Sequence, residues 1–120
     1  ESMKFDITGE KIAITLCNKS FENYKVLSGF PAMLPVLHSM LIVPALIYTF
    51  EMLRKEGIGE FEDLRWFKSI KRTLNKNNMT LNEELLDTMP SFELAQKSLD
   101  LPVNRAFDAL VSMDMTDEEE

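Results

Sequence analysis

The 120-residue sequence has one cysteine, one histidine and four glycines. The single cysteine, Cys17, excludes an internal disulfide bond and any metal site built from several thiolates. His38 has no second soft ligand in phase with it along a helix, which argues against a zinc site. The glycines, at positions 9, 29, 57 and 59, form neither a phosphate-binding loop nor a dinucleotide-binding motif. We therefore predict that the protein holds no metal and no cofactor.

Charged side chains are absent from residues 30–50. A helix that is apolar all round must be buried all round, so this segment is predicted to form a central helix. Pro31 and Pro35 suit its first turns, where missing backbone donors cost little. Pro44 lies in mid-helix, where a proline costs about 3 kcal/mol. We expect either a kink between Met40 and Pro44 or two helices that meet there.

The same uncharged segment is just long enough to span a membrane. Arg54 and Lys55, which follow it, would suit a cytoplasmic helix end. The prolines and His38 argue against a span, and the amphipathic segments downstream need a large apolar surface to cover. We therefore predict that the segment is a core helix and that the protein does not enter the membrane.

Residues 5–16 alternate between apolar and polar side chains on either side of a short link, Thr8 to Lys11. This period-two pattern around a glycine predicts an N-terminal β-hairpin. Two strands alone are marginally stable, so the hairpin is expected to pack on the central helix or to pair with strands of another chain. Its inward side chains would be Phe5, Ile7, Ile12, Ile14 and Leu16.

Short amphipathic helices are indicated where apolar residues recur every three or four positions. Ser20, Thr80 and Ser91 are the predicted N-caps, with Thr80 forming a capping box with Glu83. The expected fold is α+β and predominantly α-helical, with the hairpin packed on a long kinked apolar helix and three to four short amphipathic helices after it. The predicted short helices after the central one cover residues 60–76, 80–88, 91–99 and 102–113. The helix that Ser20 caps would carry Phe21, Tyr24 and Leu27 on one side; the alternative is a strand over residues 23–26.

The chain divides by composition into three parts. We interpret residues 1–3 as a tag remnant, residues 4–113 as a single domain and residues 114–120 as a solvated acidic tail. The first residues lack the basic and apolar regions of a secretory signal, which together with the lone thiol favours a cytoplasmic protein. The order of the elements resembles that of uncharacterised domains from bacteria and phages. This resemblance identifies no functional residues.

The net charge of −7 is unevenly distributed. Residues 54–76 carry seven basic and four acidic side chains, whereas residues 77–120 carry two and eleven. The overall acidity argues against a general nucleic-acid binder. The basic residues of the helix over 60–76 are interpreted as its solvated back; the alternative is a nucleic-acid-binding accessory module that uses them to contact phosphates. They are Arg65, Lys68, Arg72 and Lys76.

Cys17 and His38 are the one pair that offers nucleophilic catalysis, which would require them to approach within hydrogen-bonding distance. No predicted helix start or arginine cluster adjoins Cys17 to lower the pKa of its thiol. His38 is expected to be a buried histidine with a satisfied ring. We therefore predict that the protein is not an enzyme and keep a Cys/His enzyme fragment as the alternative.

The predicted central helix is too long for a domain of this size to enclose. Residues 30–53 would extend for about 36 Å as a helix, whereas a domain of this length has a radius of gyration of roughly 13–14 Å. We expect the uncovered part to meet a second copy in a homodimer, or a larger protein assembly. The predicted function is a non-catalytic protein-protein interaction or oligomerisation domain of a bacterial or phage protein. The predicted dimer contacts are Leu37, Leu41, Ala45 and Tyr48.

Overall fold

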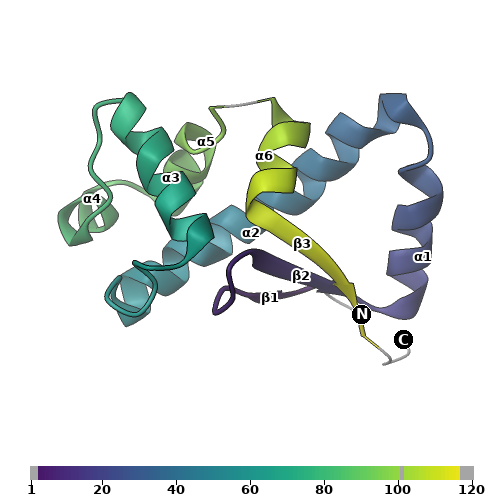
Figure 1. Cartoon of the computed structure of the whole chain (residues 1–120), viewed down its shortest axis with the longest axis horizontal. Helices are drawn as coiled ribbons and strands as arrows, with labels where there is room; N and C mark the ends of the chain where they lie inside the picture. Colours follow the sequence, from purple (N-terminus) through teal and green to yellow (C-terminus); the bar gives the residue numbers. More distant parts are fainter. Residues whose placement is uncertain (1–2, 101, 117–120) are drawn as a thin grey trace.

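The computed structural model describes residues 3–100 and 102–116. Within them, six α-helices surround a small three-stranded sheet, so the predicted α+β, predominantly helical class is confirmed. Figure 1 shows the helix α2 (Leu34–Glu56) running along the molecule, with α1 (Asn18–Leu27) at one end and α3 to α5 at the other. The remaining helices are the 3₁₀ turn η1 (Pro31–Met33), α3 (Arg65–Lys76), α4 (Glu83–Thr88), α5 (Ser91–Lys97) and α6 (Val103–Leu110).

The sheet confirms the N-terminal hairpin and adds a strand that the sequence analysis missed. Strand β1 (Lys4–Asp6) pairs antiparallel with β2 (Ile12–Leu16), as predicted. Strand β3 (Val111–Met115) lies on the other side of β2 and runs parallel to it, so the strand order is β1-β2-β3. The third strand therefore comes from the same chain, which supplies the additional pairing that the hairpin needs.

Strand β3 corrects the predicted C-terminal boundary of the last helix. A helix was expected over residues 102–113, but α6 ends at Leu110 and the chain is extended from Val111. The residues that follow alternate in chemistry, Val-Ser-Met-Asp-Met, which is a strand pattern. Residues 114 and 115, predicted to begin the solvated tail, belong to this strand; residues 117–120 of the predicted tail lie outside the described part of the chain.

Helix α2 continues without interruption through Pro44, so the alternative of two helices meeting there is wrong. Pro35 occupies its first turn, as predicted. The hydroxyl of Thr49 donates to the carbonyl of Ala45 at 2.7 Å, inside the buried face of the helix. The core forms where this face meets the sheet and helices α3 to α6. Its largest fully buried members are Trp66, Phe50, Phe67, Ile12, Ile14 and Ile42.

The start of α3 is held by the turn of the hairpin. A helix was predicted from residue 60, but residues 60–64 form turns and α3 begins at Arg65. The Glu10 carboxylate accepts from the Arg65 backbone N–H at 3.0 Å, and the Glu10 carbonyl accepts from the Trp66 N–H at 3.1 Å. The indole N–H of Trp66 donates to the Ile7 carbonyl at 2.9 Å. A distant segment therefore supplies the cap that the local sequence lacks.

The N-caps predicted for α4 and α5 are also corrected. Asn82, not Thr80, caps α4, and its side chain accepts from the Leu85 N–H at 2.9 Å. Pro90 is the N-cap residue of α5, so Ser91 is the first residue of the helix. The Ser91 side chain is buried and serves another purpose, because it hydrogen-bonds to side chains of α2.

Arg54 joins α2 to the segment that contains α4 and α5. Its Nε donates to the Leu86 carbonyl at 2.7 Å and its Nη2 to the Met89 carbonyl at 2.9 Å. Its Nη1 donates to Ser91 Oγ at 2.8 Å and to Glu51 Oε2 at 2.7 Å, while the Ser91 hydroxyl also donates to Glu51. We call these side chains the Arg54 cluster. It fixes the end of α4 and the start of α5 against α2.

Candidate interaction surface

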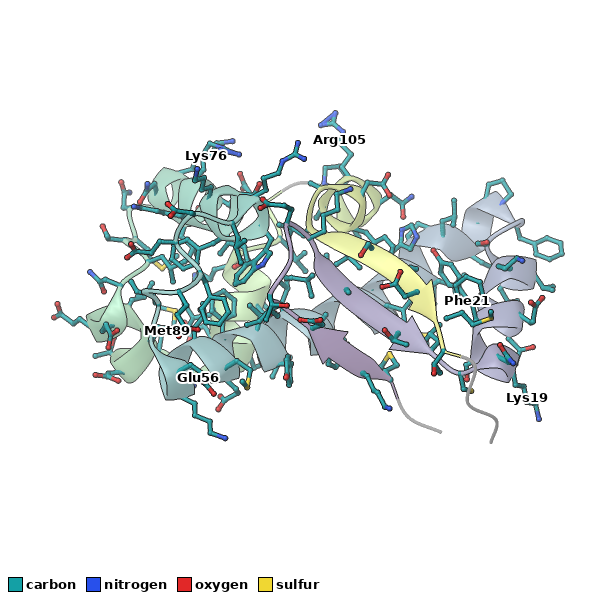
Figure 2. The ribbon with its side chains drawn as sticks, turned by 60° about the horizontal axis from the view of Figure 1, so that its bottom comes forward. Lys19, Phe21, Glu56, Lys76, Met89 and Arg105 are labelled. Carbon is teal, nitrogen blue, oxygen red and sulfur yellow. The ribbon has the colours of Figure 1, made fainter. Side chains whose placement is uncertain are left out.

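Helix α1 is attached to the molecule by one face only. None of its ten residues, all within the described part of the chain, is buried. Phe21 and Tyr24 are half-buried and pack against the core, with their ring centroids 6.4 Å apart. Figure 2 shows Phe21 directed inward from α1, toward the rest of the molecule. A helix of this length draws most of its stability from packing, and in α1 the exposed apolar side chains are Val26 and Leu27 at its C-terminal end.

The exposed apolar side chains gather where α1, η1 and the first turns of α2 meet. Residues 3–100 and 102–116 hold seven exposed large hydrophobic side chains, and five of them lie between positions 26 and 40. Val26 and Met40 are each 64% exposed and Phe30 is 57% exposed. We name this set the α1–α2 apolar surface; it comprises Val26, Leu27, Phe30, Val36 and Met40.

A hollow of about 310 Å³ adjoins the α1–α2 apolar surface. Leu27 and Met40 line it, together with Leu16 from the end of β2 and Leu41 from α2. Its lining, as far as the structure describes it, is uncharged. The hollow gives the apolar surface a concave part that a side chain of a partner would fill.

The four predicted dimer contacts lie in different environments. Ala45 is fully buried and Leu37 is 9% exposed, so both belong to the core of their own chain. Leu41 and Tyr48 are half-buried, and the Tyr48 ring packs on Phe5 with centroids 5.3 Å apart. The side chains of α2 that are free to meet a partner are therefore on a neighbouring face.

His38 is a satisfied core histidine, as predicted. It is 6% exposed, and its Nδ1 lies 2.7 Å from Asn104 Oδ1, within hydrogen-bonding distance. Its ring stacks on Phe107 with centroids 3.8 Å apart and planes 2° from parallel. These contacts tie α2 to α6.

Cys17 lies at the N-cap position of α1, a helix start that the sequence analysis placed at residue 20. Its thiol donates to Ser20 Oγ at 3.4 Å. The thiolate form would instead accept from the hydroxyl and the backbone N–H of Ser20, which lowers the pKa of Cys17 to about 7. The side chain is only 4% exposed. Among the described residues, its hydrogen-bond partner is Ser20, whereas that of His38 is Asn104. The structure therefore does not join the two as a catalytic pair.

The basic residues predicted for α3 are all exposed and lie along one side of the helix, opposite the buried Trp66 and Ile70. The periodicity of the sequence predicted that all four basic residues lie on one side of the helix. The structure adds Lys11, from the turn of the hairpin, which lines a hollow together with Arg65, Lys68 and Arg72.

Two further properties of the described chain concern metal ligation and membrane insertion. Residues 3–100 and 102–116 contain no group of three or more His, Cys, Asp or Glu side chains arranged to hold a metal ion. The segment Pro31–Glu56 is long and apolar enough to cross a bilayer, a property that core helices share. Its buried residues, from Leu37 to Leu53, pack against the sheet and the other helices in this structure.

Comparison of the chain with models of protein families, with curated proteins and with solved structures finds no match. The assignment of function therefore depends on the surfaces described above.

Proposed function

We propose that the protein is a non-catalytic interaction domain that forms a homodimer through the α1–α2 apolar surface. The observation that carries the proposal is the concentration of five exposed hydrophobic side chains in one short segment. Contiguous exposed apolar surface marks sites of association, whereas single exposed hydrophobic residues are ordinary.

The length of α2 explains why the other elements do not cover the α1–α2 apolar surface. Its 23 residues extend for about 35 Å, and the longest dimension of the molecule is 40 Å. The other helices and the sheet bury the part of α2 from Leu37 to Leu53. In the first turns of α2, Val36 and Met40 stay exposed, whereas their neighbours Leu37 and His38 are buried.

The distribution of charge allows a second copy of the chain to be the partner. Each copy carries a net charge of −7, which disfavours association through most of the surface. The segment from Phe30 to Phe50 has no charged side chain, so two copies can meet there without like charges in contact. In a two-fold arrangement the α1–α2 apolar surface would face itself, with Leu41 at its border.

The test compares two identical substitutions at similar exposure. Phe30 is 57% exposed within the α1–α2 apolar surface, and Phe92 is 55% exposed on α5. We expect Phe30→Glu to weaken dimerisation about tenfold or more because it places two charges in an apolar interface. We expect Phe92→Glu to leave dimerisation unchanged. Sedimentation equilibrium or light scattering over roughly 1–100 µM, a range typical of moderate interfaces, gives the mass.

A monomeric wild-type protein throughout that range would contradict the proposal, as would equal effects of the two substitutions. Co-sedimentation with phospholipid vesicles that Phe30→Glu abolishes, without any dimer in detergent-free buffer, would instead identify the apolar surface as a membrane contact.

A further inference from the structure

The basic side of α3 forms one wall of a groove. Arg65, Lys68, Arg72 and Lys76 are exposed, and none of them makes a salt bridge to a residue in the described ranges. Within the described ranges, the side-chain hydrogen bond that these four residues make runs from Arg72 Nη2 to Ser69 Oγ, at 3.5 Å. Their charges are therefore not neutralised by direct pairing within the described part of the protein.

The groove lies between α3 and α6. A hollow of about 410 Å³ is lined by Lys11, Arg65, Lys68 and Arg72, with Ala109 of α6 on the other side. A second hollow, of about 140 Å³, adjoins it through Ser69, Arg72 and Ala109 and extends to Lys76. Together we call them the basic groove. Small side chains on its α6 wall leave room for a bulky ligand to approach the cations.

No acidic side chain is among the described residues that line the basic groove. Among the residues that the structure describes, both hollows are lined by basic, hydroxyl-bearing and apolar side chains. Glu10 is engaged by the N-terminus of α3, and Asp108 meets Lys11 through its backbone carbonyl, at 2.8 Å from Nζ. The basic groove is a positively charged patch on a protein whose net charge is −7, and such a patch favours the binding of a polyanion.

We propose that the basic groove binds the phosphate backbone of a double-stranded nucleic acid without sequence preference. From Arg65 to Lys76 the cations extend for about 16 Å along α3, a length equal to about five base-pair steps of roughly 3.4 Å measured along the axis of a duplex. Aromatic side chains on which the bases of a single strand would stack are absent from the described lining. Trp66 and Phe67, the aromatic residues of α3, are buried.

Binding through phosphates is strongly dependent on salt. With five cations engaged, the logarithm of the affinity is expected to fall with the logarithm of the salt concentration at a slope of about −4 to −5. This inference is independent of the proposed dimer, because the basic groove and the α1–α2 apolar surface share no residue.

The experiment measures fluorescence anisotropy of labelled duplexes of about 24 base pairs, at roughly 50–200 mM salt, the range over which phosphate contacts dominate. Lys68→Glu with Lys76→Glu tests the groove. Lys19→Glu with Lys55→Glu is the matched control, since both lysines are exposed. Figure 2 shows Lys76 and Arg105 on one side of the molecule, Lys19 far from them, and Glu56, the neighbour of Lys55, on the opposite side.

We expect the groove variant to bind duplexes about tenfold or more weakly than the wild type. The magnitude of its salt slope is expected to be smaller by about 2. The control variant is expected to keep the wild-type slope and to stay within about threefold of wild-type affinity, because only the long-range charge changes. DNA and RNA duplexes, compared in parallel, identify which source of the phosphate backbone is preferred.

Absence of duplex binding by the wild-type protein at low salt would overturn the proposal. Equal weakening by the two double variants would also overturn it, as would binding to single strands alone. Circular dichroism of each variant establishes that a loss of binding is not a loss of fold.

Discussion

The guanidinium group of Arg54 shows how much of this structure depends on one side chain. Its donors satisfy two backbone carbonyls near the end of α4 and the hydroxyl of Ser91 at the start of α5. Its side chain is 29% exposed, so water reaches these acceptors only in part. The sequence shows an arginine near the end of an apolar helix but not which distant carbonyls it would meet.

Replacement of Arg54 tests the Arg54 cluster. We expect Arg54→Met to lower the free energy of unfolding by about 2–3 kcal/mol, because carbonyl groups lose their charged donor in a partly buried place. Urea denaturation followed by circular dichroism measures the change. Lys55→Met removes the same charge from the adjacent exposed position and is expected to cost less than about 0.5 kcal/mol. Equal effects of the two substitutions would show that only the charge matters.

Glu51 makes the Arg54 cluster sensitive to pH. A hydrogen bond from Ser91, and then the charge and hydrogen bond of Arg54, hold the pKa of the Glu51 carboxyl below its usual value. The contribution to stability is therefore present above the unfolded-state pKa of about 4.3 and is lost as the pH falls through the lower folded-state value. We expect the stability difference between wild type and Glu51→Gln to narrow below about pH 4, as measured by urea midpoints. A difference that stays constant from pH 7 to pH 3 would contradict this assignment.

His38 illustrates which features of a residue the sequence predicts. A lone histidine in an uncharged helix was predicted to be buried and satisfied, and both features are confirmed. Its partner, Asn104, is 66 residues away and nothing in the local sequence indicates it. Burial follows from the neighbours along the helix, whereas the identity of a partner follows from the tertiary fold.

At the scale of elements, the start of α3 is set by a distant group that caps it. The predicted start of α3 at residue 60 was wrong because Glu10, from the hairpin turn, supplies the acceptors at Arg65. Strand β3 was missed because its apolar residues also fit the end of a helical stripe. The parallel partner on β2, which decides between the two structures, lies about 100 residues earlier in the chain.

The Glu10 cap leads to a prediction about α3. We expect Glu10→Ala to lower the free energy of unfolding by about 1 kcal/mol, since it removes a negative side-chain acceptor from a helix N-terminus. Glu62→Ala, at an exposed position just before the same helix, is expected to change stability by less than about 0.5 kcal/mol. Urea denaturation of both variants checks the prediction, and amide exchange at the first turn of α3 should increase in Glu10→Ala only.

At the scale of the whole molecule, the fold class, the hairpin and the long central helix could be predicted because each has a periodic or compositional signature. The uncharged segment also indicated the region of the proposed interface. The residues within it could not be chosen, because Leu37 and Ala45 have the same chemistry as Val36 and Met40. The other helices decide which of them stay exposed. The basic stripe was predicted in full, but the groove was not, since Lys11 and Ala109 come from remote elements.

The position of β3 beside β2 has a consequence for the order of events during synthesis. Residue 12 of β2 pairs with residue 111 of β3. The ribosome must therefore add nearly a hundred further residues after β2 begins before β2 can pair with β3. Until then one edge of that strand is open, and a nascent chain has to be shielded or kept dilute. Closing so large a loop late makes assembly of the sheet slow relative to formation of the helices.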